Sequence, residues 1–354
     1  MTHRFLSHED LIDLIEELVA ANTQVIAPVR AEDDPEQIDY LPIHTLEEAS
    51  FGVRQPRLSL KGFFLPASEV LLRYEQTKER VEIREVSTEA QPKVILTATP
   101  CDAAALEIVD KVMNWDYRDE LWFGRRLATT IVSLQCTVAD STCFCSALGL
   151  TDFSRGSDLL LVPVEGGYLA QVITPKGAAL LKERGTAEIP ASIQAEANAA
   201  QSELRKKVEA NLPPLPADFR AWLAKNFSHP VWETMALRCH GCRVCASVCP
   251  TCHCFDIVDE HDSSSEGVRR RNWDSCQTSK FTLHASGHNP RGSQSERFRQ
   301  RIQHKFSIYP GRFGEILCTG CGRCSRACPG GMDLPELLGE LTTLAQAEPE
   351  GNSI

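Results

Sequence analysis

The sequence predicts two unlike regions joined by a helical linker. Residues 1–188 are expected to form an α/β (or α+β) domain, because short apolar runs typical of buried strands alternate there with amphipathic segments typical of helices. Residues 189–216 are rich in Ala, Glu, Gln and Lys and end in a proline-rich joint, which predicts a connecting helix. Residues 217–354 contain one cysteine pattern twice between short helical segments, so a second, helical domain is expected there.

The elements of the first domain follow from local patterns. Ser7 and Asp10 have the spacing of a capping box, and apolar residues at helical spacing continue to about Ala21. The elements predicted next are a strand at 25–29, a surface loop at 33–40, a helix near 68–74, a strand at 81–86 and a hairpin formed by 159–164 and 168–173.

Two further strands are predicted to end beside cysteines. Residues 93–99 are a continuous apolar and β-branched run that stops just before Cys101, with Asp102 expected as the N-cap of the following helix. Residues 127–134 form a similar run that ends just before Cys136. Open α/β sheets place their functional groups at the carboxyl ends of strands, so both thiols are expected at a functional edge of a partly parallel sheet.

These two thiols and two others form a candidate third metal site. Cys143 and Cys145 are two residues apart, so their side chains can point to the same side of an extended segment. Four thiols gathered in this way could hold an iron–sulfur cluster. The alternative is that they are inert, because free cysteines are among the most buried side chains. The candidate ligands are Cys101, Cys136, Cys143 and Cys145.

The most specific pattern is a run of four cysteines, followed by proline, that occurs twice. Three thiols at two-residue gaps can surround one face of a cubane, and a fourth thiol three residues later reaches a different cluster, as in two-cluster ferredoxins. We therefore predict an α-helical ferredoxin domain with two [4Fe–4S] clusters that exchange ligands between the runs. The first cluster is expected on Cys239, Cys242, Cys245 and Cys328, and the second on Cys318, Cys321, Cys324 and Cys249.

Structural zinc is the alternative interpretation of the two runs. Zinc takes four ligands around one ion and usually binds separated pairs of cysteines, which a triple run closed by Cys-Pro fits poorly. Three other thiols, Cys252, Cys254 and Cys276, could form a further metal site only with an additional ligand; the alternative is that they pack beside a cluster. The histidines that could complete such a site are His253, His284, His288 and His304.

The composition limits the class of protein. With 354 residues, 42% hydrophobic and 24% charged, the chain can bury a large core, so its 15 cysteines are not staples of a small domain. We expect a cytoplasmic protein, since no apolar leader follows Met1, no apolar run approaches the ~18 residues of a membrane span, and thiols in a reducing compartment serve as metal ligands. A net charge of −11 argues against nucleic acid as a partner.

Basic residues are concentrated in the long insert between the cysteine runs. They are Arg269, Arg270, Arg271, Lys280, Arg291, Arg297, Arg299, Arg301, Lys305 and Arg312. They could form a solvated face, compensate the negative charge of the clusters, or dock an acidic partner. If they compensate cluster charge, neutralising Arg269, Arg270 and Arg271 would lower at least one midpoint potential.

Several catalytic signatures are missing from the sequence. It has no strand-anchored Gly-x-Gly-x-x-Gly, no Gly-x-x-x-x-Gly-Lys-Ser/Thr and no His-Glu-x-x-His. No Ser or Cys nucleophile is convincingly paired with a base, so no catalytic residue is assigned. The pattern indicates an electron carrier that does not itself make or break bonds.

Longer motifs around the cysteines resemble a known family. They include Pro100-Cys101-Asp102, Cys143-Phe144-Cys145, Cys249-Pro250-Thr251-Cys252, Arg271-Asn272-Trp273-Asp274-Ser275-Cys276, His304-Lys305-Phe306 and Lys61-Gly62-Phe63-Phe64-Leu65-Pro66. With the two runs, they are similar to those of one family of iron–sulfur subunits, found in anaerobic sulfite reductase and, as the beta subunit, in soluble NiFe hydrogenases, or sulfhydrogenases.

The resemblance implies a protein that relays electrons from a flavin- and NAD(P)H-binding partner to a catalytic partner, a sirohaem sulfite reductase or a NiFe hydrogenase. It also implies that the long insert packs as helices around the clusters. Two alternatives from other classes stay open at this point. One is a zinc-bearing interaction module, and the other is an autonomous iron–sulfur reductase with the Cys101 region as its catalytic metal site.

Overall fold

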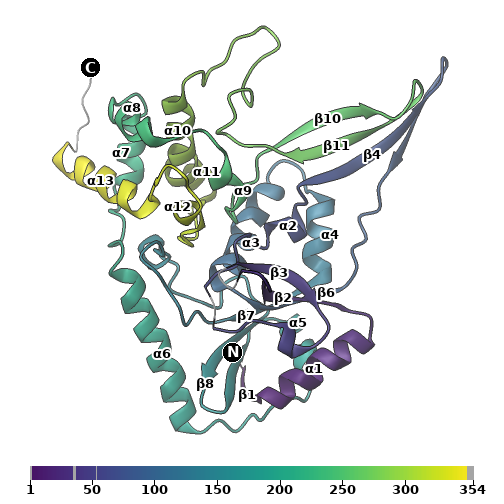
Figure 1. The fold of residues 1–354 in the computed structure, drawn as a ribbon, viewed down its shortest axis with the longest axis vertical. Coiled ribbons are helices and arrows are strands. Elements are labelled where there is room, and N and C mark those ends of the chain that lie inside the picture. The colour runs from purple at the N-terminus through teal and green to yellow at the C-terminus, as the bar shows by residue number, and fades with distance from the viewer. Residues whose placement is uncertain (1, 35–36, 53, 349–354) are drawn as a thin grey trace.

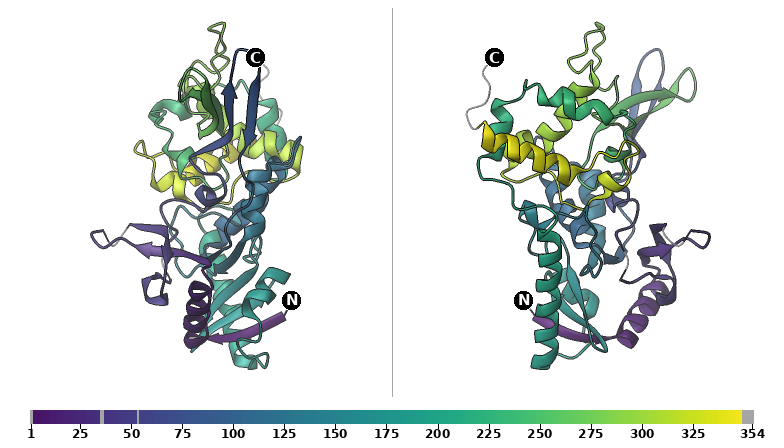
Figure 2. Two further views of the ribbon diagram at one scale, coloured as in Figure 1. Left: turned by 90° about the vertical axis from the view of Figure 1, so that its right-hand side faces the viewer. Right: turned by 60° about the vertical axis from the view of Figure 1, so that its left-hand side comes forward.

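The computed structural model describes residues 2–34, 37–52 and 54–348. Figure 1 shows a mixed sheet flanked by helices at one end of the molecule, a region of short helices at the other, and long hairpins that project to one side. Figure 2 shows the same arrangement from two further directions. The predicted combination of an α/β region followed by a helical, cysteine-rich region is therefore present.

The larger sheet has seven strands in the order β1-β9-β8-β7-β6-β2-β3. Its four central strands are parallel, and the pairings at both edges are antiparallel. The strands are β1 (Thr2–Ser7), β2 (Gln24–Arg30), β3 (Ile38–Ile43), β6 (Lys93–Ala98), β7 (Thr129–Leu134), β8 (Leu159–Val164) and β9 (Gly167–Val172). The partly parallel sheet and the β8–β9 hairpin agree with the sequence prediction, whereas the loop expected at 33–40 is shorter because β3 begins at Ile38.

Helices cover both faces of this sheet, because alternate side chains of each buried strand point to opposite sides. Val94 and Leu96 of β6 pack with α1 on one face, and Ile95 packs with α3 and with Trp122 of α4 on the other. The helices of this region are α1 (His8–Ala20), α2 (Lys61–Phe64), α3 (Pro100–Met113), α4 (Glu120–Ala128), α5 (Pro175–Leu181) and α6 (Ala191–Glu209), with short turns η1 (Leu46–Glu48) and η2 (Ser146–Leu148).

The predicted linker helix is present as α6, and it packs on the sheet. Ala197, Leu204 and Val208 are buried against Leu160 and Leu169 of the β8–β9 hairpin. Helix α6 therefore contributes to the core of the first region and does not act as a free spacer. The limits of the domains given above stay a prediction.

A second sheet of four strands corrects two expectations. Its order is β10-β11-β4-β5, with all pairs antiparallel. The strands are β4 (Ser68–Gln76), β5 (Val81–Glu85), β10 (Phe255–His261) and β11 (Glu266–Trp273). The helix predicted near 68–74 is wrong, because pairing of β4 with two neighbours overrides its local pattern. The insert is likewise not wholly helical, since it begins with the β10–β11 hairpin.

The cysteine-rich region is built from short helices around its own core. Phe144 of the first region is buried in this core with Trp222, Phe298, Phe306 and Leu338. The helices are α7 (Phe219–Lys225), α8 (Val231–Met235), η3 (Ala236–Arg238), α9 (Val244–Ser247), α10 (Gln294–Gln303), a π-helical turn η4 (His304–Ile308), α11 (Tyr309–Phe313), α12 (Arg323–Arg326) and α13 (Leu334–Ala347). Across the described residues, no helix combines the length and apolarity needed to cross a bilayer.

Candidate iron–sulfur centres

The first cysteine run forms a tight loop that leads into α9. Gly241 and Arg243 both have positive φ, +63° and +70°, so the backbone curls between the thiols. This loop lines a cavity together with the end of the second run. The four thiols of the first predicted set all line this cavity: Cys239, Cys242, Cys245 and Cys328. The structure therefore brings the set together, and ligation itself stays a prediction.

The second run repeats the same local geometry before α12. Gly320 and Gly322 have φ of +63° and +74°, at the positions equivalent to Gly241 and Arg243. Here too the run lines a cavity, and Arg301 and Lys305 also line it. All four thiols of the second predicted set line it: Cys318, Cys321, Cys324 and Cys249. In both sets the fourth thiol comes from the other run.

The four thiols of the N-terminal region also converge. They line one cavity, and the set is Cys101, Cys136, Cys143 and Cys145. Cys136 follows the end of β7 as predicted, but Cys101 lies in the first turn of α3, whose N-cap is Thr99. Asp102 is therefore not the N-cap expected from the sequence, and its carboxylate serves a different contact described below.

Burial makes proton displacement part of metal binding at these sites. It raises the pKa of Cys145 to about 11 and that of Cys318 to about 12, and it raises that of Cys136 further still. The thiols are therefore protonated at neutral pH, and a metal centre must displace their protons to bind them as thiolates. Across the described residues, no three His, Cys, Asp or Glu side chains are grouped closely enough to share a single metal ion. In a [4Fe–4S] cluster each thiolate binds its own iron.

The three cavities lie in a row. Cys324 lines both the first and the second cavity, and Cys321 lines both the second cavity and the N-terminal one. The backbone of the second run is in direct contact with the segment that carries the N-terminal thiols. Phe144 N donates to Gly320 O at 2.8 Å, and a Cβ on Gly320 would lie 2.5 Å from Cys145 N. One site therefore follows the next without an intervening layer of protein.

Polar contacts fix the N-terminal thiols against the second run. Asp102 and Arg323 form a bidentate ion pair, with both arms at 2.6 Å, and Tyr40 Oη donates to Asp102 Oδ2 at 3.0 Å. In the sequence, Asp102 follows Cys101 directly, and Arg323 lies between Cys321 and Cys324. The ion pair therefore aligns the Cys101 segment with the loop that carries Cys321.

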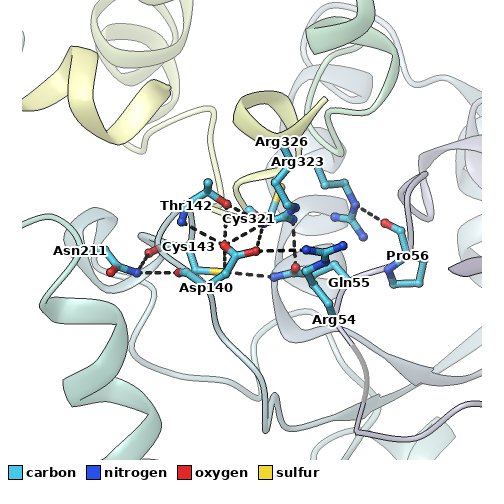
Figure 3. Close-up of polar contacts among 10 residues, drawn as sticks. All are labelled: Arg54, Gln55, Pro56, Asp140, Thr142, Cys143, Asn211, Cys321, Arg323 and Arg326. Carbon is cyan, nitrogen blue, oxygen red and sulfur yellow. Dashed lines mark hydrogen bonds and ion pairs between the residues drawn. The ribbon is translucent and has the colours of Figure 1, made fainter. Parts of the chain in front are cut away.

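Asp140 makes a second connection, shown in Figure 3, where its carboxylate lies among side chains from three segments. Arg326 Nη1 contacts Asp140 Oδ2 at 3.0 Å, and Thr142 Oγ1 donates to Asp140 Oδ1 at 2.6 Å. Asn211 donates to the carbonyl oxygens of Asp140 and Cys143, both at 2.8 Å. Burial alone would raise the pKa of Asp140, but the Thr142 hydrogen bonds and the Arg326 charge hold it below its usual value.

Two buried cations lie against the cysteine sulfurs. Lys305 Nζ donates to Cys249 Sγ at 3.4 Å and to Thr251 Oγ1 at 3.0 Å. Arg301 Nη1 donates to Cys252 Sγ at 3.4 Å, and its Nη2 donates to Cys245 O at 3.1 Å. Burial by itself would lower the pKa of Lys305, but electrostatic attraction to the sulfurs of Cys249 and Cys252 outweighs burial and raises that pKa. Both cations are thus placed to offset negative charge on the second set and its surroundings.

The arginine triplet in the insert does not have this role. Arg269 pairs with Asp259 at 2.7 Å and Arg270 with Glu260 at 2.9 Å, both on the exposed β10–β11 hairpin. Arg271 is buried between Glu69 and Asp119. The expectation that these three arginines tune a cluster is corrected, because carboxylates of the protein already neutralise them.

Several polar contacts to sulfur could not be found from the sequence. Gln294 Nε2 donates to Cys239 Sγ at 3.2 Å, and Gln55 Nε2 donates to Cys143 Sγ at 3.4 Å. Neither glutamine belongs to a motif, and each lies more than fifty positions from its cysteine. Of the histidines considered as ligands, His284 and His288 contact each other edge to face in the insert, and His253 contacts His304 in the same way.

Comparisons with known proteins agree with this arrangement. A family model described as a 4Fe-4S dicluster domain matches residues 238–332. Sulfhydrogenase 2 subunit beta of Pyrococcus furiosus is 30% identical to this chain over 301 residues, which cover 84% of this chain and 87% of the relative. No solved structure matches the chain. The C-terminal region is therefore ferredoxin-like and of an iron–sulfur type.

Proposed function

This chain belongs to the family of sulfhydrogenase beta subunits, as its motifs predicted, and we propose that it relays electrons between two other subunits of an oxidoreductase complex. The observation that carries the proposal is the row of three cysteine-lined cavities, in which neighbouring cavities share Cys324 or Cys321. A continuous row of such sites suits transfer through the chain.

Two [4Fe–4S] clusters are proposed in the C-terminal region, on the two crosswise sets of thiols given above. A third is proposed on the N-terminal set of Cys101, Cys136, Cys143 and Cys145. When bound, such clusters supply one-electron transfer at potentials set by hydrogen bonds to sulfur, burial and nearby charge.

The residues of the chain have separate tasks in this scheme. Lys305 stabilises negative charge at the second set, because it donates to Cys249 from a buried position, and the buried Arg301 lines the same cavity. Gln294 donates to Cys239 and so orients the first set. The Asp102–Arg323 pair holds the N-terminal set against the second, and apolar side chains such as Phe144 keep water from the space between them.

Two kinds of partner are proposed, a reductase that binds flavin and NAD(P)H and a catalytic redox protein of the NiFe hydrogenase or sulfite reductase type. The relative's name, which describes one subunit of a sulfhydrogenase, supports membership of such a complex. We propose a cytoplasmic location, where thiolate-bound clusters are compatible with the reducing environment. No nucleic-acid partner is proposed, in keeping with the net charge of −11.

Anaerobic purification of the full chain tests the proposal. About eight irons with equal acid-labile sulfide are expected from the C-terminal sets and about twelve if the N-terminal set is filled. Cys249→Ser should remove the cluster of the Cys318 set and leave the Cys239 set, while Ser247→Ala, an exposed change two residues away, should keep both. A colourless zinc protein would contradict the proposal, and so would a Cys318 centre that survives in Cys249→Ser.

The partners are tested by isolating the chain under anaerobic conditions from its own cells and identifying the proteins that co-purify. The expected companions are a flavoprotein and a catalytic metalloprotein. Reductase activity by the isolated chain, without any other protein, would favour an autonomous enzyme in place of a relay.

A further inference from the structure

One buried hydroxyl group beside the row of sites has no hydrogen-bond partner. Thr319 is 1% exposed, and its Oγ1 forms no hydrogen bond with any of the described residues. Burial of a hydroxyl group away from water is unfavourable unless another group replaces the lost hydrogen bond, so native structures seldom leave one unsatisfied. The Thr319 hydroxyl is therefore expected to meet a partner that the polypeptide does not supply.

Thr319 is part of the wall of the second cavity. It lies between Cys318 and Gly320 in the second run, and it lines this cavity together with the four thiols of the second set. Other buried polar side-chain atoms of the described residues also lack a partner, such as Thr342 Oγ1 on α13. None of the residues that carry those other atoms lines one of the three cysteine-lined cavities. Thr319 is thus distinguished by its position beside a proposed cluster.

Neighbouring donors at the second set already have acceptors. Gly320 N, the next backbone donor along the run, donates to Cys318 Sγ at 3.4 Å. Thr251 Oγ1, another threonine hydroxyl beside this set, donates to Leu317 O at 2.9 Å. Of these three donors, only the Thr319 hydroxyl has no acceptor among the described residues.

The acceptor that suits this position is a sulfur atom of a bound cluster. A [4Fe–4S] cluster held by thiolates presents sulfur atoms that accept hydrogen bonds, and these bonds help to set its potential. A threonine hydroxyl has one hydrogen to donate and can rotate to direct it. A buried water molecule would need two to four polar partners, whereas Thr319 Oγ1 is the one buried side-chain atom at this cavity that lacks a partner among the described residues.

The first run has no equivalent hydroxyl. His240 occupies the corresponding position, between Cys239 and Gly241, and it is exposed to solvent. The two runs share their cysteine spacing and their positive-φ loops, but they differ in the side chain that follows the first cysteine. A hydrogen bond from this position is therefore available to the second cluster alone.

We propose that Thr319 Oγ1 donates a hydrogen bond to a sulfur atom of the second cluster and thereby raises its midpoint potential. A hydrogen bond to sulfur favours the more negative, reduced state. This role rests on the proposed relay, because it requires a cluster on the Cys318 set. Lys305 donates to Cys249 of the same set, so the middle site of the row receives two groups that favour reduction.

A redox titration of the full-length chain, purified without oxygen and followed by electron paramagnetic resonance, tests this role. The second cluster is identified by the signal that disappears in Cys249→Ser. Thr319→Val replaces the hydroxyl with a methyl group and should lower the equilibrium constant for reduction of this cluster several-fold, where tenfold corresponds to about 59 mV. The iron content should stay that of the unaltered chain.

Two further variants separate the hydroxyl from general effects of substitution. Thr319→Ser keeps the hydroxyl and should keep the potential. Thr342→Val removes an unpartnered hydroxyl on α13, away from the three cavities, and should leave every potential unchanged. An unchanged potential of the second cluster in Thr319→Val with its full iron content would overturn the proposed role, and so would an equal decrease in Thr319→Ser.

Thr319→Ala covers the case in which valine prevents assembly of the cluster, because alanine removes the hydroxyl and adds no atom to the cavity wall. Its second cluster should show the same decrease in potential as that of Thr319→Val. Loss of about four irons from both variants would overturn the proposed role, since the side chain would then be required for assembly and not for the potential.

The relay and the role of the hydroxyl fail in different ways. If the unaltered chain contains no iron at all, the relay itself is wrong. If it contains iron that responds to Cys249→Ser, but the potential of the second cluster does not respond to Thr319→Val, only the role of Thr319 is wrong.

Discussion

Asp102 and Arg323 meet in a bidentate ion pair whose side chains are 0% and 2% exposed. Asp102 follows Cys101 directly, and Arg323 lies between Cys321 and Cys324, so one contact joins the ligand segments of two proposed clusters. Arg323 Nε also donates to Pro56 O at 2.8 Å, and Tyr40 donates to the carboxylate. With these additional hydrogen bonds, both charges are satisfied away from water.

Breaking this pair should destabilise the protein strongly. Asp102→Ala leaves Arg323 charged and buried, and loss of one partner of a buried pair costs about 3–5 kcal/mol in the free energy of unfolding. Asp259→Ala, which breaks the exposed pair with Arg269, should cost at most about 1 kcal/mol. Anaerobic denaturant unfolding of the two variants compares them directly. Similar losses for the two would show that the buried pair has no special structural role.

Lys305 should raise the midpoint potential of the second cluster. Its Nζ donates to Cys249 Sγ and stays charged, so it favours the more negative, reduced state. Lys305→Met should lower that potential by tens of millivolts, where about 59 mV corresponds to a tenfold change in a one-electron equilibrium. Lys305→Arg should restore most of the effect.

The matched control is Arg269→Gln, because Arg269 is paired with Asp259 on the hairpin. Its potentials should equal those of the unaltered chain in a redox titration monitored by electron paramagnetic resonance. If the midpoint potential changed in Arg269→Gln but not in Lys305→Met, the arginine triplet and not Lys305 would compensate the cluster charge.

The N-terminal thiols should act as a set. Cys145→Ser should lower the iron content by about four and leave the two C-terminal clusters in place. Ser146→Ala, one residue away, should keep the full iron content. Iron and sulfide analysis with Mössbauer spectroscopy gives the number of clusters. If Cys145→Ser has the same iron content as the unaltered chain, the four thiols are inert packing residues.

Gly320 is required where the N-terminal site meets the second run. Its φ is +63°, and a Cβ there would lie 2.5 Å from Cys145 N and 2.6 Å from Phe144 C. Backbone atoms cannot move aside cheaply, so Gly320→Ala should cost about 2–5 kcal/mol from strain and overpacking together. It should also reduce iron at the N-terminal site.

Gly331 is the control for this prediction, because it has φ +62° but no atom within 4 Å of the added Cβ. Gly331→Ala should cost only the roughly 1–2 kcal/mol of the left-handed conformation. Unfolding measurements and iron content on both variants separate the two contributions. Equal effects would mean that contact with Cys145 is unimportant.

Prediction from sequence succeeded where the determining contacts are local. The strands at 93–98 and 129–134 follow from continuous apolar runs, and the capping box at Ser7 starts α1 as expected. It failed at 68–74, where β4 exists because β5 and β11 flank it. It also failed for the arginine triplet, since the partners Asp259, Glu260 and Glu69 could be identified only from the pairing of the strands.

The sequence by itself determined the membership of the two crosswise cysteine sets that line the C-terminal cavities, and the family, because closely spaced thiols and positive-φ loops are encoded within a few residues. Only the tertiary structure decided which remote groups meet them. The meeting of Cys101, Cys136, Cys143 and Cys145, the approach of Lys305 to Cys249 and the Asp102–Arg323 pair all depend on packing between distant segments. The physical reason is that a chelating loop is a short-range property of the chain, whereas burial and charge pairing are set by the whole fold.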